Sequence, residues 1–306
     1  MICLMANHLK IIGEAYKLFK DTNTSVSAAK NPPHIRCLKK YFLTKKEEEK
    51  CTNASLTLGT ITHDVTEKAW VENKTIEEVF NSKIIQDKIN NYVPFDEKDK
   101  MKFQFGLKYL QDIAKNHIEN LKELPKQKWK TEVELTTWTP PVSIYWRMFL
   151  DLMGETHIND LKNKFPTPKL APLKVKQKKE NPNRIGDWVC TLSKIDPRVF
   201  TSDLMQISLY AHTTGLKPTL SYASATDRVL FTEDNTPELK PENLKIWLKE
   251  LIAYELAWEK KLKAANGSLD ELMWLCVPDF SDIRKRTFWY QGIPEEYIER
   301  YINFYV

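Results

Sequence analysis

The sequence predicts one α/β domain with helical additions, because segments typical of strands are clustered between blocks typical of helices. Up to residue 125, apolar side chains recur at helical spacing. After that point the chain becomes rich in β-branched and aromatic residues. A chain of 306 residues with 42% apolar and 11% aromatic residues can bury a sizeable core. We therefore expect a single domain over 1–306.

The first part of the chain is expected to be helical. A periodic stretch at 8–19 and a lysine-rich helix or turn at 37–50 are separated by the Pro32-Pro33 pair. The clearest helix covers 58–71, and two more are expected between residues 76 and 121. Within 58–71 one apolar stripe repeats every three or four residues and contains Leu58, Ile61, Val65 and Ala69.

Strands are expected next. Alternating and β-branched sequence predicts strands at 130–139, 143–153 and 156–162, with Gly154-Glu155 as a compact turn between the last two. The stretch 165–183 holds four prolines and a lysine cluster, which predicts a mobile insertion.

The last part of the chain returns to helices. We expect a helix at 202–213, a strand hairpin at 217–231, and helices at 242–265 and 295–305. The domain then divides into a helical N-terminal region (1–55), a core (56–231) with a basic insertion (163–200), and a helical C-terminal region (232–306).

Residue spacing excludes several function classes. The eight glycines never form GxGxxG or GxxxxGK[ST], which rules out the usual dinucleotide-binding and Walker-type sites. The five cysteines contain no CxxC pair and the six histidines no HExxH. A sparse, odd cysteine count suits a reducing compartment, and no apolar run approaches the roughly 18 residues that span a bilayer. We expect a soluble, intracellular, cytoplasmic protein that makes no membrane contact.

Basic residues exceed acidic ones by five, and they are unevenly distributed. Between residues 163 and 184 there are seven basic residues and one acidic residue. A polyanion could bind there, although on charge alone a solvated loop is the simpler explanation. If the partner is DNA, the candidates for sequence-independent phosphate contacts are Lys174, Lys176, Lys178 and Lys179.

The expected hairpin gathers charged residues on one face. If Gly154-Glu155 is a two-residue turn, alternation places Asp151, Asp160 and Lys162 together, with three leucines facing the core. Carboxylates on such diagonal partners, about 7 to 8 Å apart at Cβ, could converge on an oxygen-preferring dication such as Mg²⁺ or Mn²⁺. An ordinary solvent-facing hairpin explains the same residues without a ligand.

Two further patterns carry polar groups that could serve a site. Gln206 and Tyr210 are spaced i, i+4, so one helical face presents an amide and a phenol. In the segment GTITH, Gly59 permits close backbone approach and His63 offers an imidazole ligand. A chance QxxxY pair and a hydrogen-bonded core histidine are the alternatives.

In this order along the chain, the motifs resemble those of the RecB-like branch of the PD-(D/E)xK nuclease superfamily. The matching pieces are GTITH (59–63), FLDLM (149–153), NDLKNK (159–164) and QISLY (206–210). The resemblance implies a restriction-endonuclease-like core, in which a mixed central β-sheet is flanked by helices and the hairpin forms the catalytic edge.

The resemblance also implies roles for individual residues. The metal ligands would be His63, Asp151, Asp160 and the carbonyl of Leu161. Lys162 would position or activate the attacking water, while Gln206 and Tyr210 would steady that lysine and the phosphate. Glu67, one turn beyond His63, would support the ligands from behind. The residues implied in catalysis are therefore Asp151, Asp160, Lys162, Gln206 and Tyr210.

The implied activity is that of a metal-dependent DNA exonuclease of recombination, repair or replication, with Mg²⁺ or Mn²⁺ as cofactor. Its substrate would be single- or double-stranded DNA, and a recombination or replication protein could be a further partner. Free-standing members of the branch without a motor domain are often viral, so a phage-type enzyme of the host cytoplasm is expected.

Two alternatives stay open. A structure-specific endonuclease would use the same chemistry, and a catalytically inactive nucleic-acid-binding or assembly protein would keep only the fold. Iron–sulfur members of the branch have one cysteine before the histidine motif and a close cysteine group near the C-terminus. Here Cys37 resembles the first, but Cys276 stands alone, so we expect no iron–sulfur cluster.

Overall fold

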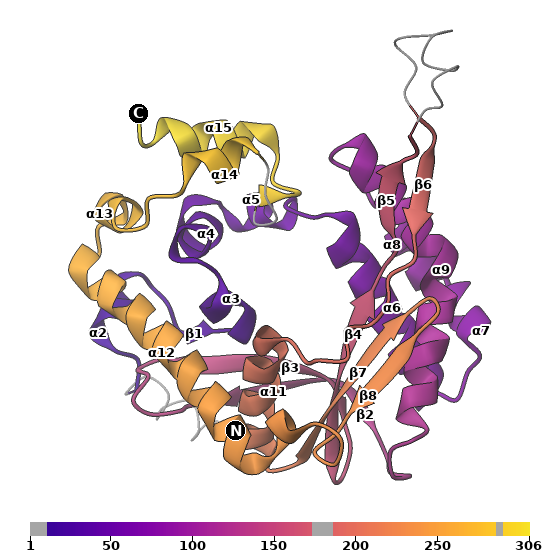
Figure 1. Cartoon of the computed structure of the whole chain (residues 1–306). Coiled ribbons are helices and arrows are strands. Elements are labelled where there is room, and N and C mark those ends of the chain that lie inside the picture. Colours follow the sequence, from indigo (N-terminus) through magenta and orange to yellow (C-terminus); the bar gives the residue numbers. More distant parts are fainter. Residues whose placement is uncertain (1–10, 173–185, 286–289) are drawn as a thin grey trace, which may run out of the picture.

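The structure, a computed structural model, describes residues 11–172, 186–285 and 290–306. Its centre is a mixed β-sheet with helices on both faces (Figure 1). In the described residues this sheet has six strands in the order β1-β3-β4-β7-β8, with β2 also paired to β3. The α/β class and the mixed central sheet are confirmed. The strands are β1 (Asn23–Thr24), β2 (Lys130–Thr137), β3 (Tyr145–Met153), β4 (His157–Lys164), β7 (Lys217–Ser224) and β8 (Arg228–Phe231).

Strand β4 is paired differently on its two sides. Toward β3 it is antiparallel, and the pairing is confined to Leu152↔Asn159 and Met153↔Ile158. Toward β7 it is parallel over its whole length. Parallel neighbours need a crossover connection, and helix α11 (Thr201–Thr214) lies in the connection between β4 and β7. Asp160 and Lys162 of β4 thereby face a helix that the same crossover supplies.

Two long helices cover one face of the sheet and α11 contacts the other. Helix α6 (Ala54–Val71) packs on α9 (Glu97–Leu121), and both contact β4. The approach is close, because a Cβ added at Gly106 of α9 would lie 2.1 Å from Leu58 Cδ1 of α6. The apolar stripe expected in the 58–71 helix is buried. This packing fixes the height of α6 above the sheet.

The remaining helices are mostly short. In Figure 1 the N-terminal helices and the C-terminal helices lie together, on the side of the molecule away from α9. These elements are α2 (Glu14–Leu18), α3 (Val26–Lys30), α4 (Pro33–Cys37), the π-helix η1 (Leu38–Phe42), α5 (Lys45–Glu49), α7 (Ile76–Phe80), α8 (Lys83–Asn90), the 3₁₀-helix η2 (Pro237–Leu239), α12 (Pro241–Ala265), α13 (Leu269–Trp274), α14 (Phe280–Arg284) and α15 (Glu295–Asn303).

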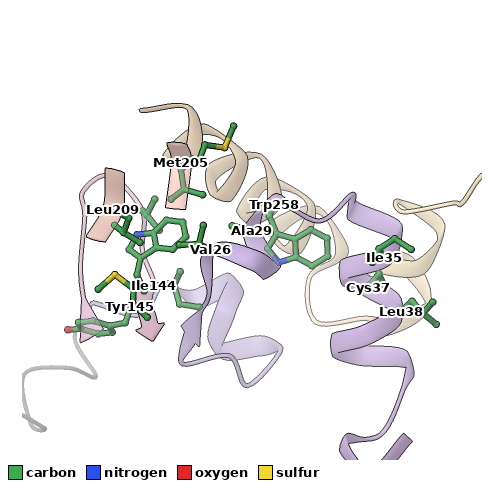
Figure 2. Close-up of a cluster of buried hydrophobic side chains, with 14 of the residues drawn as sticks. Val26, Ala29, Ile35, Cys37, Leu38, Ile144, Tyr145, Met205, Leu209 and Trp258 are labelled. Atoms are coloured by element: carbon green, nitrogen blue, oxygen red, sulfur yellow. The ribbon is translucent and has the colours of Figure 1, made fainter. Parts of the chain in front are cut away.

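One hydrophobic core joins both terminal regions to the sheet. Figure 2 shows part of it, in which Val26 and Ile35 from the N-terminal region lie in the same cluster as Ile144 of the sheet region, Leu209 of α11 and Trp258 of α12. The two terminal regions therefore fold with the sheet and not as separate units.

None of the helices in the described part of the chain has the length and apolar character that crossing a bilayer requires.

A buried ion pair ties the terminal regions together. Arg36 Nη1 and Nη2 donate to the two carboxylate oxygens of Glu255, at 2.7 and 2.6 Å. The Tyr16 hydroxyl donates to Glu255 Oε1 at 2.8 Å, and the guanidinium carbon of Arg36 lies 4.6 Å from the ring centroid of Trp258. Both charged side chains are almost fully buried.

The expected hairpin turn was wrong in length. Met153 pairs with Ile158 and not with Thr156, so the connection is two residues longer than a two-residue turn. In this register Asp151 comes opposite Asp160 and not diagonal to it. Because the shift is an even number of residues, every side chain keeps the face that alternation assigned to it.

Other expectations also need correction. Three helices, α7, α8 and α9, occupy the region between residues 76 and 121 where two were expected. The insertion contains a separate antiparallel pair of strands that was not expected, β5 (Thr167–Leu170) within the stretch 165–183 and β6 (Trp188–Thr191) after it, while residues 173–185 lie outside the described residues. Of the helix expected at 8–19, the structure describes α2 (Glu14–Leu18), which begins after Gly13, while residues 8–10 lie outside the described residues.

Candidate active site

Strand β4 presents Asp160 and Lys162 on one face of the sheet. The residues are two positions apart, so their side chains project in the same direction, toward α11. Lys162 Nζ lies 2.6 Å from Asp160 Oδ2 and 3.7 Å from Asp203 Oδ1. Asp160 is 2% exposed, so this ammonium–carboxylate contact is largely removed from water.

Helix α11 holds this pair in place. Lys162 Nζ donates to Gln206 Oε1 at 3.4 Å, and Gln206 Nε2 donates to Asp160 Oδ1 at 3.3 Å. The same amide nitrogen lies 3.0 Å from the Tyr210 hydroxyl, which donates to the backbone carbonyl of Phe149 at 3.0 Å. The i, i+4 spacing of Gln206 and Tyr210 therefore connects β4 to β3 through one face of a helix.

A second group of ligands forms where α6 meets β3. His63 Nδ1 of α6 lies 3.4 Å from Asp151 Oδ1 of β3, and the Leu161 backbone N–H donates to Asp151 Oδ2 at 2.7 Å. Glu67 joins them, since one ligand atom each from His63, Glu67 and Asp151 lies within 4.8 Å of the other two. Glu67 thus lies among the ligand atoms and not behind them.

These residues line a cavity of about 370 Å³. Besides the ligand group, its lining includes Asp64, Glu132 and Glu134. The candidate site is therefore open to a ligand from the side of β2, and its wall carries negative charge.

Two carboxyl groups at the site are protonated more readily than usual. Burial, together with the Asp151 and Glu132 carboxylates, raises the pKa of Glu67 to about 9. Burial and the Asp151 carboxylate raise the pKa of Asp160 to about 6, against the opposing effect of Lys162. The crowded carboxylates disfavour full ionisation, and a cation would relieve that repulsion.

The neighbouring groups shift the opposite way. Burial alone would raise the pKa of Asp151, but the charges of His63 and Lys162 lower it to about 2. Burial acts to lower the pKa of His63 and of Lys162, yet nearby carboxylates more than reverse this effect, so both pKa values are raised. At neutral pH Lys162 is therefore a fixed positive charge beside Asp160.

The donor set fits a divalent cation. Carboxylate and carbonyl oxygens are the ligands that Mg²⁺ and Mn²⁺ prefer, and one imidazole is compatible with Mn²⁺. If all three were ionised, Asp151, Asp160 and Glu67 would carry more negative charge than Lys162 and His63 can balance, and the raised pKa of Glu67 reflects this. The arrangement can therefore hold a dication next to a fixed cation.

The structure brings together the predicted side chains of four separate segments. His63 pairs with Asp151, and Asp160, Lys162 and Gln206 form a second contacting group with Tyr210 behind Gln206. The backbone N–H of Leu161, which donates to Asp151, links the two groups, and Asp160 lies outside the close group of His63, Glu67 and Asp151. The candidate DNA-binding residues of the basic insertion lie outside the described residues; these are Lys174, Lys176, Lys178 and Lys179.

Sequence reasoning missed two residues. Asp203 lies three positions before Gln206 on α11, so the i, i+3 spacing was a signal that could have found it. Lys30 of α3 donates to the Ser202 carbonyl at 2.8 Å and interacts electrostatically with Lys162. No local pattern links Lys30 to a site more than a hundred residues away.

Comparison with protein-family models, with curated proteins and with solved structures found no match to this chain.

Proposed function

We propose that the protein is a metal-dependent DNA exonuclease of the RecB-like branch of the PD-(D/E)xK superfamily. One observation carries the proposal. Asp160 and Lys162 of β4, held by Gln206 of α11, lie beside the His63–Asp151 pair that joins α6 to β3. The mixed sheet with helices on both faces supports it as well.

The residues divide the work of phosphodiester hydrolysis. His63, Glu67, Asp151 and Asp160 would hold the metal, together with the carbonyl of Leu161. A bound dication would polarise the phosphoryl group and lower the pKa of a water. Lys162, whose raised pKa keeps it protonated, would donate to the scissile phosphate and orient the water, and it would not act as a base.

Gln206 and Tyr210 have a supporting role in this proposal. Gln206 contacts both Asp160 and Lys162, so it fixes the distance between a metal ligand and the ammonium group. Tyr210 fixes Gln206 in turn. Pre-set geometry of this kind lowers the barrier because little reorganisation is needed during the reaction.

Digestion of end-labelled single- and double-stranded DNA with Mg²⁺ or Mn²⁺ tests the proposal. We expect Asp160→Ala and Lys162→Ala to lower the rate by a factor on the order of 10² to 10³ or more, with circular dichroism unchanged. The matched control is Asp270→Ala, an exposed aspartate in the first turn of α13, which should digest DNA normally.

Four results would contradict the proposal. If both variants digested DNA as fast as the unmodified protein, these two residues would have no part in the reaction. If digestion persisted in EDTA, the reaction would not depend on a metal. Cleavage of covalently closed circles would favour the endonuclease alternative, because a strict exonuclease needs an end. Binding without digestion under every metal condition would favour the inactive alternative.

A further inference from the structure

Three cavities follow one face of α6. That face consists of Leu56, Thr60, His63 and Glu67, which are spaced i, i+4, i+7 and i+11 and so lie in one row. A cavity of about 710 Å³ and a cavity of about 750 Å³ both include Leu56 in their linings. The second shares Thr60 with the 370 Å³ cavity of the candidate site. We call this series of three cavities the α6 path.

Charge changes sign along the α6 path. In the described linings, the first two cavities contain lysines and no carboxylate, whereas the third contains carboxylates and neither lysine nor arginine. Lys88 of the middle cavity is already paired with Asp64. A polyanion would therefore be held along the first two cavities and would meet metal ligands only at the third. The lysines are Lys30, Lys39, Lys50, Lys88 and Lys102.

The first cavity also contains a lysine, Lys30, that interacts electrostatically with Lys162. Lys30, in its lining, donates to the Ser202 carbonyl at the start of α11, one residue before Asp203. Burial, followed by the charge of Lys162, lowers the pKa of Lys30 to about 8. A phosphate placed between these two ammonium groups would offset their mutual repulsion.

The middle cavity is lined by exposed apolar side chains, which contacts to phosphate groups alone would not explain. Val93 is 75% exposed, Leu56 58% and Phe95 44%. Tyr92 is stacked on Phe103 with ring centroids 4.0 Å apart, which fixes the loop that carries Phe95. Exposed apolar and aromatic side chains beside lysines are the combination that binds unpaired nucleotides, since bases stack while phosphates pair with cations. In a duplex the base faces are already stacked and would gain nothing from Phe95.

We propose that the α6 path binds single-stranded DNA, with bases on Phe95 and its apolar neighbours, phosphates on the lysines, and the strand end at the carboxylate cavity. This inference rests on the proposed function and names its substrate as an unpaired strand.

Fluorescence anisotropy with a labelled oligo(dT), in EDTA so that no cleavage occurs, tests the path on the full chain. Phe95→Ala should weaken binding about five- to a hundredfold, because stacking on one base is lost. The dependence of binding on salt should stay as in the unmodified protein. Phe95→Tyr, which keeps the ring, should bind like the unmodified protein.

The lysines should behave differently in the same experiment. Lys39→Ala and Lys102→Ala should each weaken binding. Each should also make the negative slope of the logarithm of the binding constant against the logarithm of the salt concentration less steep by about 0.7, as expected for one lost phosphate contact on a single strand. The matched control is Lys249→Ala, an exposed lysine on α12, which should change neither quantity.

Failure of the path and failure of the proposed function give different results. Equal binding of duplex and oligo(dT), tighter binding of oligo(U) than of oligo(dT), or no effect of Phe95→Ala would overturn the path. Each of these could occur while Asp160→Ala still abolishes digestion, which would leave the proposed function standing. If the chain instead binds oligo(dT) as described but digests no DNA with any metal, the hydrolytic function and delivery of the strand end fail, and the binding surface stands.

Discussion

The molecule contains two buried clusters of charge that are built on different principles. In the first, Arg36 and Glu255 match one cation to one anion, and hydrogen bonds reach both carboxylate oxygens. In the second, the carboxyl groups of Glu67, Asp151 and Asp160 are crowded near Lys162 and His63, and ionisation of all three would exceed the charge of the two cations. The first cluster is fully paired, whereas the second can be fully ionised only with a further cation. The first cluster is therefore complete without a ligand, and under the proposed function the second would take up a dication.

The pKa values of the second cluster show that crowding of its carboxyl groups lowers the stability of the folded protein when they ionise. Glu67 and Asp160 have raised pKa values, to about 9 and about 6, because their ionised forms are buried near other carboxylates. A folded-state pKa above the ordinary value means that stability is lost as pH rises toward that value. In the metal-free protein, Glu67 and Asp160 should therefore contribute a loss of stability between about pH 4 and pH 9, which His117, with a pKa lowered to about 3 by burial, opposes below about pH 6.5.

The largest effect on stability should come from breaking the complete cluster. Arg36→Met leaves the Glu255 carboxylate buried without its cation, which should lower the free energy of unfolding by about 3 to 5 kcal/mol in urea denaturation. The double variant Arg36→Met, Glu255→Gln should recover part of that loss. Lys17→Met, which removes an exposed partner of Glu14, should change stability by less than about 1 kcal/mol. If Arg36→Met is as stable as the unmodified protein, the two clusters do not differ as described.

At the candidate site, removal of a carboxyl group should raise stability and not lower it. Glu67 is 4% exposed, and Glu67→Gln removes a carboxyl group that must be protonated in the folded state. At pH 7.5, with chelator, the variant should be more stable by about 2 to 4 kcal/mol, and the gain should vanish below about pH 4.5.

Added metal should change the outcome of that comparison. Mn²⁺ should raise the melting temperature of the unmodified protein and of Arg36→Met, but it should raise that of Glu67→Gln by less, because a ligand is missing. Two results would contradict this account of the candidate site. One is a Glu67→Gln variant that is less stable than the unmodified protein at all pH values, and the other is equal stabilisation of the two proteins by Mn²⁺.

The smallest effect should come from Tyr210. Tyr210→Phe removes a hydrogen bond to the Phe149 carbonyl and one from Gln206, and it leaves the charges in place. We expect a loss of about 1 kcal/mol of stability and up to about a tenfold loss of nuclease rate. Tyr109→Phe, on α9, is the matched control. A rate as low as that of Lys162→Ala would mean that Tyr210 touches the reacting atoms.

Local sequence patterns predicted the elements that carry the site. The apolar stripe on α6 and the alternation along β2, β3 and β4 depend on each segment alone, so their periodicity could be recognised. The faces of Asp151 and Asp160 also followed from alternation, and they survived the wrong turn length because the error was an even number of residues.

Long-range contacts could not be predicted in this way. The pairing of His63 with Asp151 was reached only through the order of motifs, since no spacing rule joins α6 to β3. Lys30 was missed for the same reason. Strand β5 was missed because proline suppressed the strand signal, although Pro168 fits the edge of a two-stranded pair.

The parallel pairing of β4 with β7 has a consequence for how the protein is synthesised and folded. Asp160 and Lys162 leave the ribosome well before β7, so the strand that bears them remains without its main partner until residue 224 has been synthesised. The ion pair between Arg36 and Glu255 forms later still, because residue 255 is synthesised after β7. Under the proposed function, a nascent chain would therefore carry an incomplete site between the synthesis of β4 and that of β7, and it would gain nuclease activity only when translation is nearly finished.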